Sequence, residues 1–166
     1  MPSYNYGKFL TESIGSVLSQ SYADLELIVV DDGSEDRTPD VAAGAGAHVI
    51  RLASNQGKGV ALNAGFDYAR ENGYDALITM DADGQHQAES LPALLHPIMQ
   101  GEADVVIGAC TQRGSKLRKI AWKLMKRVSG LRLEDLTSGF RVYDYRAIRA
   151  WPAGRRPCWS TRMWVY

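Results

Sequence analysis

Two aspartates, spaced one residue apart, follow an apolar run in the middle of the chain. Asp81 and Asp83 come after residues 76–80, and Gln85 continues the same alternation. Because alternate residues of an extended segment point the same way, these oxygen-bearing side chains can converge on one point. Two close carboxylates favour a cation between them, and oxygen ligands suit Mg²⁺ or Mn²⁺. The spacing predicts a divalent metal site, although a polar turn at Gly84 would give the same pattern.

Strand-like and helix-like segments alternate along the chain and would position these carboxylates. Apolar, β-branched runs predict strands at residues 25–30, 48–52, 76–80 and 104–108. Helical patterns are expected at residues 9–18, after the cap-like Thr38, and at 60–71, 89–100 and 116–128. This alternation predicts an α/β domain with a mostly parallel sheet and helices on both faces. Since ligands of such sheets bind where strands end, Asp31, Asp32 and Asp81 should share one edge.

The composition is that of an ordinary globular domain. Its 166 residues are 45% hydrophobic, and 19 basic residues balance 19 acidic ones. Because the charges balance, the chain has no net positive charge that would attract nucleic acid, and no nucleic-acid partner is expected. The 2 cysteines make no disulfide framework and fit a reducing, cytoplasmic compartment. The apolar runs are too short to span a bilayer and no signal-peptide pattern is present, so we expect a soluble chain.

Two further motifs carry polar chemistry. Residues 55–63 open an expected helix with two glycines and Lys58, which suits backbone approach to a phosphate beside a cation. The glycine spacing differs from that of a P-loop. Residues 137–141 end in Arg141 and fit either an anion contact or a turn that leads into an edge strand.

Taken in order, these motifs resemble family 2 of the inverting nucleotide-sugar glycosyltransferases, which have the Rossmann-like GT-A fold. The resemblance covers about residues 2–150. It rests on Pro-Ser-Tyr-Asn at 2–5, Asp-Asp-Gly-Ser at 31–34, residues 55–63, Asp-Ala-Asp-Gly-Gln-His at 81–86 and Ser-Gly-Phe-Arg at 138–141. The second half is most similar to the dolichyl- and polyprenyl-phosphate mannose or glucose synthases.

The resemblance implies a role for each group of residues. A UDP- or GDP-sugar donor would bind to Pro2, Tyr4, Asp31, Asp32, Lys58, Gly59 and Asp81. Mg²⁺ or Mn²⁺ would bind to Asp81, Asp83 and Gln85, and the catalytic residues would be Asp83 and Arg141. A lipid-phosphate acceptor would meet Arg113, Arg118, Ser138 and Arg141. The implied activity is metal-dependent sugar transfer to a polyprenyl or dolichyl phosphate, at the inner face of the membrane, for cell-envelope glycans.

The residue types agree with this chemistry. A divalent ion held by carboxylates neutralises a departing diphosphate as a Lewis acid. A lipid phosphate is already anionic at neutral pH, so it needs cationic positioning more than a general base. The basic stretch at residues 113–132 supplies such cations, although a basic helix face is as often simply solvated.

Both ends depart from the family pattern. The strand that normally precedes Pro2 is missing, which predicts an unpaired edge at residues 27–30 and homo-oligomers formed through it. Tyr6 stands where many relatives have a glutamate. Residues 1–150 are expected to form a partial catalytic domain.

The last residues, 151–166, form an atypical tail rich in Trp, Arg and Pro. Residues 158–164, back-translated and read one base out of register, give a Tyr-Gln-Asp segment like that of relatives. We therefore hypothesise a frameshift near Ala150.

Two alternatives remain open. A non-enzymatic receiver domain is also doubly wound and binds Mg²⁺ beside a phosphorylatable aspartate, an arrangement that Asp31, Asp32 and Asp81 imitate. It leaves residues 57–59 and 138–141 unexplained. A nucleotide-binding remnant would keep the donor site without turnover.

Overall fold

The computed structural model describes residues 1–22, 24–81, 88–108, 138–151 and 163–165. Residues 163–165 are described by their backbone alone. Several predictions from the sequence concern residues outside these ranges. These residues are Asp83, Gln85, Arg113 and Arg118, the helix expected at 116–128 and most of the tail.

Two small sheets form the centre of the molecule. In the first, parallel strands lie in the order β1 (Pro2–Ser3), β2 (Ile28–Asp31) and β3 (His48–Arg51). The second has the order β4 (Ala76–Thr79), β6 (Arg141–Asp144), β5 (Val105–Ile107) and β7 (Met163–Val165). The expected α/β alternation with a parallel sheet is confirmed, and β6 is the exception because it runs antiparallel to both β4 and β5.

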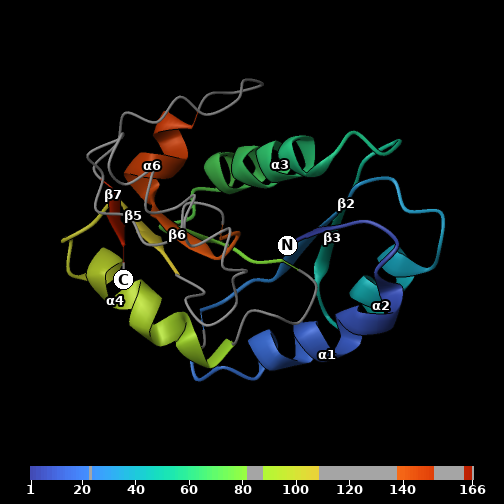
Figure 1. Ribbon diagram of the computed structural model, residues 1–166, viewed down its shortest axis with the longest axis horizontal. Coiled ribbons are helices and arrows are strands. Elements are labelled where there is room, and N and C mark those ends of the chain that lie inside the picture. The colour runs from blue at the N-terminus through green and yellow to red at the C-terminus, as the bar shows by residue number, and fades with distance from the viewer. Residues whose placement is uncertain (23, 82–87, 109–137, 152–162, 166) are drawn as a thin grey trace, which may run out of the picture.

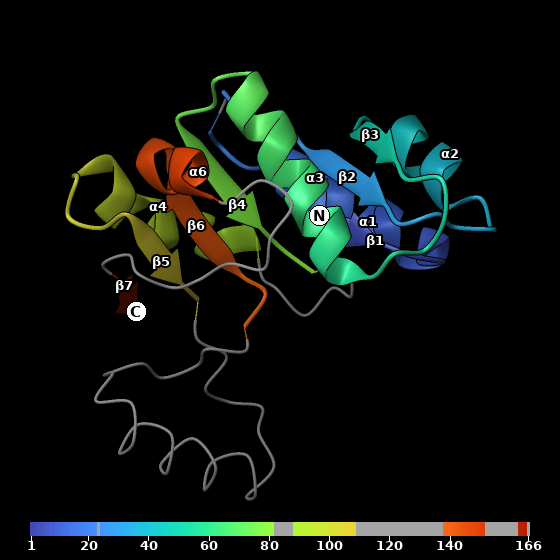
Figure 2. The same cartoon turned by 90° about the horizontal axis from the view of Figure 1, so that it is seen from above.

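Helices cover both faces of these sheets (Figures 1 and 2). One face carries α1 (Gly7–Leu18), α2 (Thr38–Gly44) and α4 (Leu91–Met99), the last preceded by a 3₁₀ turn at Ala88–Ser90. The other face carries α3 (Lys58–Glu71) and α6 (Tyr145–Ala150). Within the described ranges, none of the helices is long and apolar enough to cross a bilayer.

The strands divide the core into two clusters because their side chains alternate between faces. Val106 and Val142 pack in the cluster beneath α1 and α4. Their neighbours Val105 and Tyr143 pack on the opposite face, with Phe66 of α3 and residues of α6. Each large apolar side chain buried in this way contributes about 1.5–3 kcal/mol to folding. The two clusters fix the orientation of every strand that reaches the site.

A short first strand is present, which corrects the expected unpaired edge. β1 pairs with β2 in the register Pro2 to Val30. Val30 N donates to Met1 O at 3.0 Å and Asp32 N to Ser3 O at 2.8 Å, so the carbonyls on either side of Pro2 make the ladder bonds. A proline that has no N–H is therefore tolerated there.

The second correction concerns residues 138–141. They lead into β6, which lies between β4 and β5 in Figure 2, so β6 is an interior strand and not an edge strand. Thr79, at the end of β4, is the register partner of Arg141, at the start of β6.

A cavity of about 560 Å³ separates the two sheets. Its lining includes Met1 beside β1, Ile28 of β2, Leu77 of β4, Phe66 of α3 and Leu95 of α4. Among the described strands, β4 pairs along one edge only, with β6, and its other edge borders this cavity.

Candidate functional site

The candidate residues that the structure describes converge on one edge of the sheets. β2 ends at Asp31 and is followed by Asp32, and Asp81 comes two residues after β4. The antiparallel β6 begins at this edge, so Arg141 joins them. The two acidic segments were predicted to share this edge. Residues 138–141 join them there because the carboxyl ends of parallel strands meet the start of an antiparallel strand.

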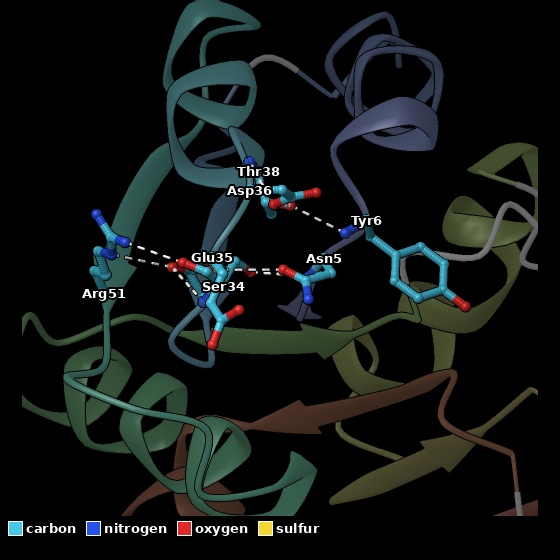
Figure 3. Close-up of polar contacts among 8 residues, drawn as sticks. Asn5, Tyr6, Ser34, Glu35, Asp36, Thr38 and Arg51 are labelled. Carbon is cyan, nitrogen blue, oxygen red and sulfur yellow. Dashed lines mark hydrogen bonds and ion pairs between the residues drawn. The ribbon is translucent and has the colours of Figure 1, made fainter.

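Asp31 is fully buried and has partners within the fold. Arg51 Nε lies 3.4 Å from Asp31 Oδ2, and Ser34 N donates to both carboxylate oxygens at 3.3 Å. A buried carboxylate needs such compensation, because an unpaired charge in the core is strongly destabilising. Arg51 Nη2 also donates to Ser34 O at 3.0 Å, which fixes the turn after β2 (Figure 3).

Asp32 holds the segment that begins α3. Its Oδ1 accepts from Gln56 N and its Oδ2 from Gly57 N, both at 2.8 Å. Gly57 is the N-cap of α3 and has a φ of 91°, a conformation that favours glycine. Lys58 is the next residue, so Asp32 fixes the backbone from which the Lys58 side chain extends.

Gly33 allows these two loops to pack. Its φ is 72°, and a Cβ at this position would lie 2.6 Å from Asn55 N. The turn after β2 thus touches the backbone just before residues 56 and 57. A side chain at residue 33 would force the loops apart.

Lys58 and Asp81 form a close ion pair. Lys58 Nζ donates to Asp81 Oδ1, and the side chains are 54% and 29% exposed. Exposed pairs of this kind contribute only about 0.2–1 kcal/mol to stability. The pair shows that the Asp81 carboxylate lies where a positive group can reach it.

Gly139 presses its backbone against the same carboxylate. A Cβ at residue 139 would lie 2.6 Å from Asp81 Oδ2 and 2.7 Å from Oδ1. Thr79 Oγ1 donates to Gly139 O at 2.8 Å and ties this segment to the end of β4. Gly139 was not among the predicted site residues, although its place between Ser138 and Phe140 in the motif was the available signal.

Arg141 is held by the turn that precedes it. Its Nε donates to Ser138 O at 2.8 Å, and Ser138 Oγ accepts from Phe140 N at 3.2 Å. Ser138 is buried, so its hydroxyl shapes the turn. Burial raises the pKa of Tyr143, while Arg141 and then Thr79 act in the opposite direction. The phenol therefore stays protonated beside the arginine.

The N-terminal loop packs against the turn after β2 (Figure 3). Asn5 N donates to Ser34 Oγ at 2.9 Å, and Glu35 N donates back to Asn5 Oδ1 at 3.1 Å. Asn5 has a φ of 53°, a conformation that asparagine tolerates better than most residues. Tyr4 is 39% exposed beside this junction.

Thr38 caps a helix other than the one it begins. Its Oγ1 accepts from Tyr6 N and Gly7 N, both at 3.0 Å, at the start of α1, and donates to Asp36 Oδ1. One donor and two acceptor sites are thereby all used. The hydrogen bond from the Thr38 hydroxyl is the main cause that lowers the pKa of Asp36. The sequence predicted Thr38 as the cap of α2, which is wrong, because the N-cap there is Arg37, without a side-chain bond.

The one predicted metal ligand that the structure describes, Asp81, fits a hard cation. Asp81 offers carboxylate oxygens that are partly exposed at a strand end and already contact an ammonium group. Within the described ranges, no three His, Cys, Asp or Glu side chains cluster as a complete ligand set. Asp83 and Gln85, the other predicted ligands, lie outside those ranges.

The described fold is that of a glycosyltransferase. Residues 1–153 match the family described as Glycosyl transferase family 2, so the chain belongs to that family. This family membership excludes the receiver-domain alternative.

Two curated relatives show the branch of the family. The chain is 37% identical over 165 residues to undecaprenyl-phosphate mannosyltransferase of Micrococcus luteus, covering 90% of this chain and 67% of the relative. It is 33% identical to polyprenol monophosphomannose synthase of Mycolicibacterium smegmatis, covering 86% of this chain and 59% of the relative. The chain thus spans about two thirds or less of these proteins.

Solved structures agree on the fold. Glucosyl-3-phosphoglycerate synthase from Mycobacterium tuberculosis, in complex with Mn²⁺ and UDP-glucose, superposes with a TM-score of 0.69 at 26% identity. The match covers 87% of this chain and 54% of that protein. These neighbours are GT-A glycosyltransferases, and the fold of the chain is of that type.

Proposed function

We propose that the chain is the donor-binding part of an enzyme that transfers a sugar from a UDP- or GDP-sugar to a polyprenyl or dolichyl phosphate, with Mg²⁺ or Mn²⁺. The observation that carries the proposal is the convergence of Lys58, Asp81 and Arg141 on one sheet edge. The names of the two curated relatives support the lipid-phosphate acceptor. The Mn²⁺ and UDP-glucose complex of the structural neighbour supports the donor and the metal.

Each part of the site has a proposed role. Pro2, Tyr4 and Asp32 line the pocket for the base and ribose of the donor, and the fully buried Asp31 supports this pocket through its contacts with Ser34 and Arg51. Lys58 and Gly59, at the start of α3, contact the diphosphate, where helix N–H groups and an ammonium both favour anions. The metal is held by Asp81, Asp83 and Gln85, and it supplies Lewis-acid neutralisation of the leaving diphosphate.

The acceptor side is built around Arg141. With Ser138, Arg113 and Arg118 it receives the phosphate head group, since a guanidinium engages two oxygens at once. Asp83 and Arg141 are the proposed catalytic residues. An acceptor of this kind is a membrane lipid, so the proposed location is the cytoplasmic face of the membrane, bound peripherally.

The division of the chain is also part of the proposal. Residues 1–150 form the catalytic part, and residues 151–166 form an atypical tail whose coding register changes near Ala150. Homo-oligomers formed through an exposed sheet edge are also part of the proposal, because an unpaired edge recruits another strand.

Calorimetric titration of UDP and GDP in Mn²⁺ and in EDTA tests the donor and metal roles together. Wild-type protein should bind one of them at least about tenfold more tightly in Mn²⁺, because the ion offsets the repulsion between carboxylate and diphosphate. Asp81→Asn should lose most of that gain. Equal affinities in EDTA and Mn²⁺ would remove the metal from the proposal. Donor binding without sugar transfer to a polyprenyl phosphate would favour a nucleotide-binding remnant.

A further inference from the structure

Lys58 has a fixed backbone and a side chain that can change partners. Asp32 accepts from Gln56 N and Gly57 N, which fixes the two residues that precede Lys58. The Lys58 side chain itself is 54% exposed, and it reaches Asp81 across the edge of the sheet. Its ammonium can therefore move within the length of its own stem while the start of α3 stays in place.

Asp81 has restricted space for a second cation. The Gly139 backbone closes one side of its carboxylate, where a Cβ would lie 2.6 Å from Oδ2. The Lys58 ammonium contacts Oδ1. A divalent ion that binds to this carboxylate must share it with the ammonium or displace it, because two positive groups on one carboxylate repel each other.

The start of α3 offers the displaced ammonium a second partner. Lys58 is the first residue of a 14-residue helix, so the helix dipole favours an anion beside it. A diphosphate at that position would attract the ammonium as Asp81 does. The same lysine can then neutralise either of two negative groups, one belonging to the protein and one to the ligand.

We infer that Lys58 is an exchangeable counter-ion, which neutralises Asp81 before the donor arrives and contacts the donor diphosphate once a divalent cation has taken Asp81. The inference rests on the proposed function for the identity of that anion. It makes the two ligands synergistic, because the metal alone must displace an internal cation, whereas the metal with a diphosphate gives that cation a new partner.

The test compares Lys58→Gln with the wild-type protein in two separate titrations. In the first, Mn²⁺ binding is measured without nucleotide, by the electron paramagnetic resonance signal of free Mn²⁺. The variant should bind Mn²⁺ about fivefold more tightly, the upper range for loss of an exposed ion pair. In the second, nucleoside diphosphate is titrated at saturating Mn²⁺, and the variant should bind about tenfold more weakly.

Two variants serve as controls. Lys58→Arg keeps the positive charge and should not bind Mn²⁺ more tightly than wild type. Lys8→Gln removes an exposed lysine from α1, on the opposite face of the sheet, and should change neither titration. Thermal unfolding of each variant verifies that the fold is retained.

The two titrations separate the possible failures. If Lys58→Gln binds Mn²⁺ no more tightly than wild type, including the case in which neither binds it, the counter-ion role is wrong. If the Mn²⁺ result holds and no protein binds a nucleoside diphosphate, the exchange onto the diphosphate and the donor site proposed above are both wrong, although the competition at Asp81 stands.

Discussion

The backbone of Gly139 lies against the carboxylate of Asp81, so close that a Cβ at residue 139 would be 2.6 Å from Oδ2. Gly139 is not among the glycines with positive φ. The position therefore needs glycine for space and not for a special backbone conformation. This contact joins the segment before β6 to the end of β4, and it gives the first prediction.

Replacing Gly139 with alanine should displace Asp81 or the start of β6. We expect Gly139→Ala to lower the free energy of unfolding by about 1–3 kcal/mol, as overpacking does, and to weaken Mn²⁺ binding. Urea denaturation and Mn²⁺ titration measure the two effects. Gly15→Ala is the matched control, since Gly15 lies within α1 and a Cβ there would meet nothing within 4 Å. That control should be neutral or gain about 0.4–1 kcal/mol.

Removing the Thr38 hydroxyl should loosen the start of α1. Thr38→Val keeps the shape of the side chain but leaves Tyr6 N and Gly7 N without their acceptor. A buried group left unsatisfied costs about 1–3 kcal/mol. Thr38→Ser should retain most of the stability in the same urea unfolding experiment. A valine variant as stable as the serine variant would show that water replaces the hydroxyl.

Replacing Trp151 should destabilise the face of the sheet under α3 and α6. Its ring stacks on Phe66 with centroids 3.7 Å apart, and its Nε1 donates to Asn63 Oδ1 at 2.9 Å. We expect Trp151→Ala to cost about 2–4 kcal/mol and Trp151→Phe, which keeps the stack, about 1 kcal/mol. A double-mutant cycle that combines Trp151→Phe with Asn63→Ala, measured by thermal unfolding, isolates the contribution of the hydrogen bond. Additive losses from Trp151→Phe and Asn63→Ala would mean that it contributes nothing.

Asp32→Ala should affect stability and donor binding together, because Asp32 fixes the start of α3. Loss of the two bonds to Gln56 N and Gly57 N should cost about 1.5–3 kcal/mol. Nucleoside diphosphate affinity should fall about tenfold or more, since the substitution also removes the charged contact that we propose between Asp32 and the ligand. Asp40→Ala is the control, because Asp40 is an exposed aspartate of α2 whose carboxylate lies 4.0 Å from Arg37. If Asp32→Ala melts earlier but binds normally when folded, the residue is structural only.

Arg141→Lys should impair use of a phosphate acceptor and spare the donor. The lysine keeps the charge but cannot engage two phosphate oxygens in a fork. In a full-length counterpart, sugar transfer to polyprenyl phosphate should fall while nucleoside diphosphate affinity is unchanged. Transfer to a neutral polyprenol should be absent in both proteins. Transfer to a free sugar hydroxyl instead would overturn the lipid-phosphate proposal.

Local patterns were sufficient to predict strands β2 to β5 and helices α1 to α4, but not the short strand β1, the helix α6 or the interior place of β6. The β-branched run at β2 indicates a strand and the apolar period of α1 indicates a helix, each from its local sequence alone. The place of β6 between β4 and β5 depends on pairing with distant residues, which periodicity does not record. The same limit explains Thr38, whose hydroxyl looked like a local cap but serves a helix that begins far earlier in the chain.

The candidate site follows the same division. Asp31, Asp32 and Asp81 were identified because they follow strands, and their convergence on one edge is a property of the α/β fold. Their partners were not predictable. Gln56 N, Gly57 N and the Gly139 backbone carry no side-chain signal, and the Lys58 contact with Asp81 depends on how the loops fold over the edge.

The interior position of β6 also orders events during synthesis of the protein. β4 and β5 do not pair with each other, and β6, the strand that lies between them, begins only at Arg141. The ribosome must therefore deliver this late segment before the second sheet can close, whereas β1, β2 and β3 can pair much earlier. The Asp81 carboxylate gains its contact with the Gly139 backbone at the same late stage. A nascent chain halted before residue 139 would have the turn after β2 but only half of the edge where metal and acceptor are proposed to meet.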